Sequence, residues 1–395
     1  MERCFMEKSL GNSQLKLRSL FIRSAAYEGM QKDGLPTEAL TEHHVAMAKG
    51  GVGLTTVSYG AVSPEARTFH EQMYINPQSL EKLALLAGAV HEAGGKVAMQ
   101  LTHCGYFTKN IKVKRPLAPS RVLNAYGILS GIIFSREMEE NDMEKVADDF
   151  ANAALGIKEA GFDAVEIHMG HGYLLSQFLS PVTNKRKDAY GGSVENRSRF
   201  PLEVLSRVME KTGPGFPVLV KLNLSDGLRK GFSLEDCKYV AKKLEDLGCT
   251  ALVLSGGFTS KSPFYLMRGK VPLLGMACNG DNFAEKVTMA LFGPFIVRKY
   301  KFEENFFLKQ AREIRTCVTM PLVYLGGVDS KAGILEILEA GFDFIALARA
   351  LIHDPDFLLK LKDGSIDRTE CNRCNKCVVE MDRQGVKCVL PLEAN

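Results

Sequence analysis

Short apolar runs alternate with amphipathic segments along most of the chain, and this alternation predicts the fold. Eight runs rich in aliphatic and β-branched residues have the length and flanking residues of buried strands: 20–25, 53–57, 96–101, 164–168, 218–223, 251–255, 321–325 and 344–348. Helical patterns lie between most of them, at 79–92, 142–160, 194–211, 234–247 and 332–339. Strands that alternate with helices predict a parallel sheet of the α/β class, and eight such units favour a closed (β/α)8 TIM barrel.

Two long segments interrupt this rhythm, residues 102–136 after the third strand and 258–303 after the sixth. Both follow strand ends, so we expect them to lie over the carboxyl end of the barrel and to shape the substrate site. The pentapeptide Glu-Ala-Gly-Phe-Asp occurs at 159–163 and again at 339–343, each time between a helix and a strand, which supports a repeated unit. We expect a barrel domain at 1–362 and a C-terminal cysteine-rich segment at 363–395.

Composition narrows the class of protein. The 395 residues are 46% hydrophobic and 24% charged, as in a folded globular protein. The net charge of +4 is spread without a long like-charge block, which argues against nucleic acid as a partner. Because no run of 18 apolar residues and no secretory leader is present, we expect a cytoplasmic protein with no membrane partner. The oligomeric state, including a homo-oligomer, is left open.

Candidate chemistry gathers after the fourth strand. His168 ends the strand, and His171 and Tyr173 follow within one short loop. At the carboxyl end of a barrel strand these three hydrogen-bond donors are expected to point at a bound ligand. Two imidazoles and a phenol can hold and polarise a carbonyl oxygen, so we interpret the three residues as catalytic and the two histidines as substrate-binding.

The last three strands end in sequences that suit a phosphate. Gly257 closes a Ser-Gly-Gly turn after the sixth strand, Gly327 closes a Gly-Gly pair after the seventh, and Ala348 and Arg349 follow the eighth. Glycines there let backbone N–H groups approach a phosphate, and an arginine supplies the opposite charge. No Walker-type loop or Gly-x-Gly-x-x-Gly turn opens the chain, so the phosphate is not expected to belong to a nucleoside triphosphate or to a Rossmann domain.

These motifs occur in the order found in one family. They are Arg23-Ser24-Ala25, Gln100-Leu101-Thr102-His103, His168-Met169-Gly170-His171-Gly172-Tyr173, Asp188-Ala189-Tyr190-Gly191-Gly192-Ser193 with Glu195-Asn196-Arg197, then Lys221 and the Gly pairs with Arg349. From about residue 17 to 388 the chain resembles the old yellow enzyme family of FMN-dependent oxidoreductases, in the branch near 2,4-dienoyl-CoA reductase and trimethylamine dehydrogenase.

The resemblance implies a cofactor site. It places Ser24 and Ala25 beside the flavin ring, Gln100 at the pyrimidine edge and Lys221 near flavin N1 and O2. The residues implied at the FMN phosphate are Gly257, Gly327, Ala348 and Arg349. Many relatives carry Arg in place of Lys221, and Cys or Thr in place of Ala25, so the flavin reduction potential stays open.

The resemblance also implies a reaction. NAD(P)H would reduce FMN, which passes hydride to the β-carbon of an α,β-unsaturated carbonyl compound such as an enone, enoate or enoyl thioester. His168 and His171 would hold the carbonyl oxygen, and Tyr173 would deliver the proton. An oxidative enzyme of the same scaffold, an amine dehydrogenase or demethylase, is the alternative. Amine oxidation of the trimethylamine type needs an aromatic bowl that binds a cation, and the absence of Trp argues against such a bowl. A lyase using Lys221 as a Schiff-base nucleophile is the third interpretation.

Four of the ten cysteines crowd near the end of the chain. Cys371, Cys374, Cys377 and Cys388 form a C-x2-C-x2-C-x10-C pattern, whose spacing predicts a metal site for a [4Fe-4S] cluster or zinc. The resemblance, with Asn375 after the second Cys, favours iron-sulfur; a vacant site with reduced thiols is the remaining alternative. Related enzymes relay electrons to a further flavin domain, so a separate electron-transfer protein is an expected partner.

Overall fold

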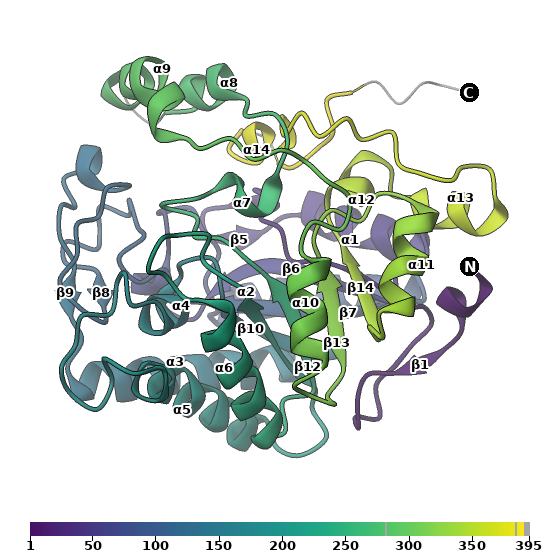
Figure 1. Ribbon diagram of the computed structural model, residues 1–395, viewed down its shortest axis with the longest axis horizontal. Helices are drawn as coiled ribbons and strands as arrows, with labels where there is room; N and C mark the ends of the chain where they lie inside the picture. The colour runs from purple at the N-terminus through teal and green to yellow at the C-terminus, as the bar shows by residue number, and fades with distance from the viewer. Residues whose placement is uncertain (281–282, 384, 391–395) are drawn as a thin grey trace.

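A closed barrel of eight parallel strands forms the centre of the molecule, and helices surround it (Figure 1). The computed structural model describes residues 1–280, 283–383 and 385–390. The barrel strands, in order around the sheet, are β3 (Phe21–Arg23), β6 (Leu54–Ala61), β7 (Lys96–Thr102), β10 (Ala164–Met169), β11 (Val218–Asn223), β12 (Ala251–Ser255), β13 (Leu322–Leu325) and β14 (Phe344–Leu347). Each coincides with an expected strand, so the predicted (β/α)8 TIM barrel is confirmed.

Five helices that cover the barrel match predicted ones: α2 (Pro77–Glu92), α3 (Glu140–Glu159), α5 (Val194–Thr212), α6 (Leu234–Asp246) and α11 (Lys331–Glu339). Four more were not predicted: α1 (Glu38–Lys49), α10 (Leu308–Arg315), α12 (Arg349–His353) and α13 (Phe357–Asp363). Side-chain caps fix several starts: Asn76 accepts hydrogen bonds from the first turn of α2, and Ser233 accepts one from Asp236 in α6. None of the helices in the described residues is long and apolar enough to cross a membrane.

Shorter elements decorate the barrel. They are η1 (Glu2–Phe5), β1 (Lys8–Ser9), β2 (Lys16–Leu17), β4 (Gln31–Lys32), β5 (Leu35–Pro36), η2 (Pro64–Ala66), β8 (Leu117–Ala118), η3 (Ile128–Ser130), β9 (Arg136–Glu137), α4 (Leu174–Leu179), α7 (Phe264–Met267), α8 (Leu273–Cys278), α9 (Phe283–Ile296) and α14 (Cys377–Glu380). The segment 102–136 contains β8, η3 and the first residue of β9, and 258–303 contains α7, α8 and α9, so both predicted insertions carry structure of their own.

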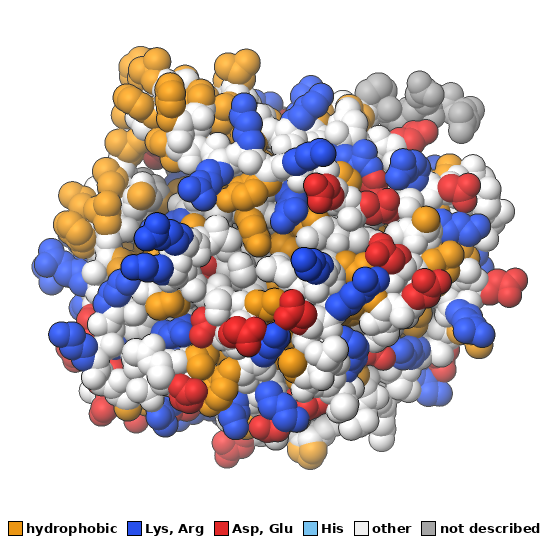
Figure 2. All heavy atoms as spheres, viewed as in Figure 1, with side chains coloured by type: hydrophobic (Ala, Val, Ile, Leu, Met, Phe, Trp, Pro, Cys, Tyr) orange, Lys and Arg blue, Asp and Glu red, His pale blue; other side chains and the backbone are white. Residues whose placement is uncertain are grey.

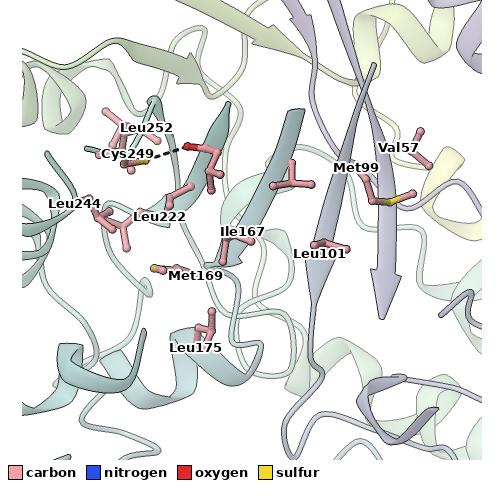
Figure 3. Packing of buried hydrophobic residues seen from close by; sticks show 14 of the residues in the cluster. Val57, Met99, Leu101, Ile167, Met169, Leu175, Leu222, Leu244, Cys249 and Leu252 are labelled. Atoms are coloured by element: carbon pink, nitrogen blue, oxygen red, sulfur yellow. Dashed lines mark hydrogen bonds between the residues drawn. The ribbon is translucent and has the colours of Figure 1, made fainter. Parts of the chain in front are cut away.

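Strand side chains that point outward form the main core with the helices. Ile167 and Met169 of β10 and Leu222 of β11 are fully buried against this layer (Figure 3). Because side chains alternate along a strand, the residues between these positions point into the barrel. The strands therefore bury both faces, which explains why they read as nearly continuous apolar runs in the sequence.

The interior of the barrel changes from apolar to polar along its axis. Near the amino ends of the strands it is filled by residues such as Ala164 and Leu219. The next inward-facing residue is Glu166 on β10 and Lys221 on β11. His168 follows Glu166 along β10 and pairs in register with Lys221. Barrel interiors are normally layered with branched aliphatic residues. The polar layers therefore mark the end of the barrel where a ligand binds.

A buried ion pair ties the first strand to the second beneath this end. The Arg23 guanidinium lies 2.5 Å from the Glu28 carboxylate, and both side chains are shielded from solvent. Glu28 also accepts a hydrogen bond from the backbone N–H of Ser58 on β6. This pair closes the loop that follows β3, which ends at Arg23, so Ser24 and Ala25 lie beyond the strand instead of inside it as predicted.

The C-terminal segment lies over the carboxyl end of the barrel, next to α8 (Figure 1). The side-chain amide of Asn279, at the end of α8, donates to the Val379 carbonyl of α14 at 2.6 Å. The predicted boundary between residues 362 and 363 falls one residue before the end of α13. The division into two domains stays a prediction.

Replacing Glu28 with Gln is expected to lower the free energy of unfolding by about 3–5 kcal/mol, because Arg23 would remain buried without its counter-charge. Chemical denaturation of the purified variant measures this. Lys145→Ala, which removes an ion pair with Glu65 at the surface, is the matched control and should cost less than about 1 kcal/mol. Equal losses in the free energy of unfolding of the two variants would show that the buried ion pair stabilises the fold no more than a surface pair does.

Candidate active site

A cavity of about 310 Å³ opens at the carboxyl ends of the barrel strands. This volume suits a cofactor or a small substrate. Nine of the residues predicted for catalysis and flavin binding lie on its wall: Ser24, Ala25, Gln100, His168, His171, Tyr173, Gly327, Ala348 and Arg349. They come from five different strand ends, so the fold brings together residues spread over most of the chain.

The two predicted histidines meet at nearly a right angle. The rings of His168 and His171 are 4.9 Å apart, centre to centre, and the ring of Tyr173 lies 4.7 Å from that of His168. Nδ1 of His168 accepts a hydrogen bond from the Gly170 N–H, which puts the proton on Nε2. Nε2 of His171 bonds to the Ser255 hydroxyl at 2.7 Å, which leaves Nδ1 for a ligand.

Burial keeps these groups uncharged. It lowers the pKa of His171 to about 3, with a further contribution from the nearby Lys221 ammonium. The pKa of His168 is also well below its usual value, mainly through burial and then through His171 and Lys221. Burial raises the pKa of Tyr173 well above its usual value, so the phenol keeps its proton. The wall thus offers neutral donors at physiological pH.

Tyr59 is a site residue that the sequence did not single out. It lies on β6, lines the cavity and shares a hydrogen bond with Tyr173; the two rings are 5.3 Å apart. Burial raises the pKa of Tyr59 to about 12. A phenol near the carboxyl end of a barrel strand would have marked Tyr59 as a candidate. The predicted strand ended at residue 57, two residues before Tyr59, so this signal was missed.

Lys221 lies behind the cavity wall. Its ammonium is 2.9 Å from the Glu166 carboxylate, 3.3 Å from the Ser24 hydroxyl and 3.4 Å from the Ala25 carbonyl. Glu166 accepts a second hydrogen bond, at 2.6 Å, from the side-chain amide of Gln100. The sequence did not identify Glu166, because an acidic residue inside an apolar run has no visible partner until the neighbouring strands are in register.

The predicted phosphate residues divide into two groups. Gly327, with φ of +78°, lines the cavity, and a Cβ there would lie 2.6 Å from the Phe306 ring, so only glycine fits. Among the described residues that line the cavity, Gly257 is not found. Its N–H donates to the Ser225 carbonyl at 2.9 Å. The structure therefore offers Gly327, and not the Gly257 N–H, to a ligand.

Arg349 joins three parts of the chain at the edge of the cavity. Its Nη1 donates to the Met267 and Arg268 carbonyls, at 2.8 and 2.9 Å, and to the Asn375 side chain at 2.8 Å. Burial lowers the pKa of Arg349, and the neighbouring cysteines Cys371, Cys377 and Cys374 oppose this shift. Asn375, noted from its place in the cysteine motif, thus links that motif to the barrel.

The four cysteines lie near the cavity. Cys371 and Cys377 line it, and burial raises the pKa of Cys377 to about 11, opposed by Arg349. Cys388 lies 3.2 Å from Nδ1 of His353. Across the described part of the chain, no three His, Cys, Asp or Glu side chains converge as metal ligands. The donor set is chemically suited to a soft metal, but the four sulfurs are not drawn into one closed shell.

A parallel barrel with its ligand cavity at the carboxyl ends of the strands defines the class of (β/α)8 enzymes. A family model described as the NADH:flavin oxidoreductase / NADH oxidase family matches residues 5–255. The 4,4'-dithiodibutanoate disulfide reductase of Rhodococcus erythropolis is 37% identical over 380 residues, which cover 95% of this chain and 92% of that protein. The chain belongs to the NADH:flavin oxidoreductase / NADH oxidase family.

Two further comparisons agree with this assignment. The NADH oxidase of Thermoanaerobacter brockii is 30% identical over 378 residues, 94% of this chain but 52% of that protein, so this chain spans about half the length of that relative. An old yellow enzyme homologue from Zymomonas mobilis shares the fold with a TM-score of 0.71 and 23% identity, covering 93% of this chain and 94% of that one. The predicted family and the predicted class, an FMN-dependent NAD(P)H oxidoreductase, are confirmed.

The low pKa of His171 predicts a loss of stability in mild acid. The unfolded chain binds a proton at this residue below a pH of about 6.5, while the folded chain does not until the pH approaches 3. Stability should therefore fall as the pH drops from about 6.5 toward 3, and His171→Gln should reduce the fall. Urea unfolding at several pH values measures it, with the exposed His70→Gln as control. If the free energy of unfolding of His171→Gln falls with pH as steeply as that of the wild type, the prediction is contradicted.

Proposed function

We propose that the enzyme reduces the C=C bond of an α,β-unsaturated carbonyl compound with electrons from NAD(P)H. The observation that carries this proposal is the pair of neutral imidazoles, His168 and His171, on one wall of the cavity beside the protonated phenol of Tyr173. Neutral donors gathered on one wall suit an oxygen atom that gains negative charge during the reaction.

The cavity wall supports the proposed FMN site. Support comes from Ser24, Ala25 and Gln100, which the resemblance assigns to the flavin ring and which line the cavity, and from Gly327, which offers a surface on which no side chain fits. Ala348 and Arg349 complete the proposed phosphate end. When bound, FMN supplies the hydride for the reaction. Lys221, with Glu166 beside it, would act on the ring electrostatically through the layer formed by Ser24.

The chain's own residues would control oxygen and proton. His168 can donate through Nε2–H because its Nδ1 is occupied, and the Ser255 hydroxyl engages Nε2 of His171, so that Nδ1 is the nitrogen left for a ligand. Since neither imidazole titrates near neutral pH, the two would stabilise an enolate by hydrogen bonding and not by charge. Tyr173 would give its proton to the substrate and regain one through Tyr59.

Disulfide reduction is the second candidate, because the disulfide reductase of Rhodococcus erythropolis is 37% identical and is covered over 92% of its length. Hydride transfer to one sulfur releases a thiol and a thiolate, a product that imidazole donors can also stabilise. The lyase interpretation is discarded, since the family is flavin-dependent and the Lys221 ammonium is ion-paired with Glu166. The oxidative alternative, the homo-oligomer, the separate electron donor and the cytoplasmic location stay predictions.

The double variant His168→Ala/His171→Ala is expected to keep FMN and to lose at least about 100-fold in the rate of enone reduction, because the developing oxyanion loses its donors. Stopped-flow oxidation of the reduced enzyme by 2-cyclohexenone, without oxygen, measures this step. His70→Ala, an exposed histidine outside the cavity, is the matched control and should react like the wild type.

The same assay separates the two candidates. Tyr173→Phe should slow alkene reduction strongly, since the carbon needs a delivered proton, but should hardly affect reduction of 4,4'-dithiodibutanoate, whose thiolate product can leave unprotonated. A wild-type enzyme that reduces the disulfide and ignores every enone tested would replace the first proposal by the second. Unchanged enone reduction in the double histidine variant would remove the role given to both residues.

We infer that Cys371, Cys374, Cys377 and Cys388 hold a soft metal, a [4Fe-4S] cluster in preference to zinc. Support comes from the thiol-only donor set, from its spacing and from the position of Cys371 and Cys377 at the cavity. The burial that raises the pKa of Cys377 favours the protonated thiol in the absence of metal. No step of the reaction is assigned to the metal.

Protein purified without oxygen is expected to contain about four irons per chain, as a [4Fe-4S] cluster requires. Metal analysis and the visible spectrum before and after dithionite measure this. Cys374→Ser should abolish the iron, whereas Cys278→Ser, at an exposed cysteine outside the motif, should retain it. About one zinc per chain would show that the site holds zinc. If both iron and zinc are absent, the four cysteines are reduced thiols without a metal.

A further inference from the structure

The exposed apolar side chains of this protein are concentrated in the two insertions. Among the described residues, 20 large hydrophobic side chains are exposed, and 14 of them belong to 102–136 or 258–303. We call these 14 residues the apolar rim: Ile111, Leu123, Tyr126, Ile128, Leu129, Ile133, Phe134, Leu274, Phe283, Val287, Leu291, Phe292, Phe295 and Ile296. Single exposed apolar residues are ordinary, but a cluster of this size marks an interaction surface.

Helix α9 carries six of the seven apolar-rim residues of the second insertion, and four of these six lie in its last six residues. Phe295 is 87% exposed, Ile296 66% and Leu291 61%. With 14 residues α9 is too short to span a bilayer, which needs about 20 apolar residues. Its exposed Phe and Leu side chains are of the kind that enter the acyl boundary of a membrane interface.

The same two insertions carry a net positive charge, and the rest of the chain carries a net negative one. Residues 102–136 contain six Lys or Arg and no Asp or Glu, and residues 258–303 contain seven Lys or Arg against three Asp or Glu. Together they carry +10, whereas the whole chain carries +4, so the remaining residues carry −6. The charge of the protein is therefore strongly divided between the insertions and the rest of the chain.

Both insertions lie on one side of the molecule and border the cavity. Figure 2 shows orange side chains over α8 and α9 and again over the β8–β9 segment, with Lys and Arg between and beside them. Phe107 and Tyr126 of the first insertion and Phe302 of the second line the cavity. A flat surface that met the apolar rim would therefore lie against the opening of the active site.

We propose that the apolar rim docks this enzyme on an anionic phospholipid surface, with the cavity opening toward the lipid. Exposed Phe and Leu side chains enter the acyl boundary, and the surrounding Lys and Arg meet lipid phosphates. A second copy of the chain is a less favourable partner for the apolar rim. The two insertions of each copy carry a net charge of +10, so two such surfaces would repel one another. The sequence led us to expect no membrane partner, since it shows the length of apolar runs but not their exposure.

Flotation of the full-length holoenzyme with lipid vesicles tests this proposal. The wild type is expected to bind vesicles of phosphatidylglycerol and phosphatidylcholine, and to bind pure phosphatidylcholine vesicles at least about tenfold more weakly, because the latter carry no net charge. Leu291→Ser/Phe295→Ser should lower the partition coefficient on anionic vesicles by about tenfold or more, since two exposed apolar side chains leave the lipid. Arg298→Glu/Lys299→Glu should do the same and should reduce the salt dependence.

Matched controls lie on α2, away from the insertions. Leu85 is 75% exposed, so Leu85→Ser removes an apolar side chain of similar exposure, and Lys82→Glu reverses an exposed charge. Both should bind like the wild type, and all variants should reduce a water-soluble acceptor at the wild-type rate. Absence of vesicle binding, or equal losses in the controls, would overturn the proposal. So would a dimer in analytical ultracentrifugation that Leu291→Ser/Phe295→Ser converts to a monomer, because a second copy would then cover the rim.

Discussion

The buried ion pair between Lys221 and Glu166 is the interaction on which the active site depends. It lies inside the barrel, where both charges are removed from solvent, and such charges are tolerated only when they are paired and hydrogen-bonded. Glu166 holds Gln100 on one side, and Lys221 reaches the Ser24 hydroxyl and the Ala25 carbonyl on the other. Three residues proposed to face the flavin are thus fixed by a single carboxylate and a single ammonium.

The same ammonium shapes the chemistry one layer above. Lys221 disfavours a second positive charge nearby, so it adds to burial in keeping His168 and His171 neutral. Neutral imidazoles with defined free nitrogen atoms are donors whose strength does not vary around neutral pH. The site therefore combines a fixed charge inside the barrel with uncharged donors on the cavity wall, and the fixed charge helps to keep these donors uncharged.

The two insertions give the barrel its individual character. Their inner side chains, such as Phe107 and Phe302, narrow the cavity, while their outer side chains form the apolar rim. Arg349 and Asn375 connect the second insertion to the cysteine segment, so these parts meet around the cavity opening. Substrate access, the cysteine site and any surface on which the enzyme docks are accordingly neighbours, although they are far apart in the chain.

Local pattern alone determined the barrel, because a strand buried on both faces needs an apolar run and a covering helix needs a periodic one, and both are visible in the sequence. It also located His168, His171, Tyr173 and the Gly-Gly pair, since each follows such a run directly. Only the tertiary structure decided the pairing of Glu166 with Lys221, the approach of Tyr59 to Tyr173 and the exposure of the apolar rim. Each of these depends on which strand or insertion lies beside another, and the register of distant segments is not written in local sequence.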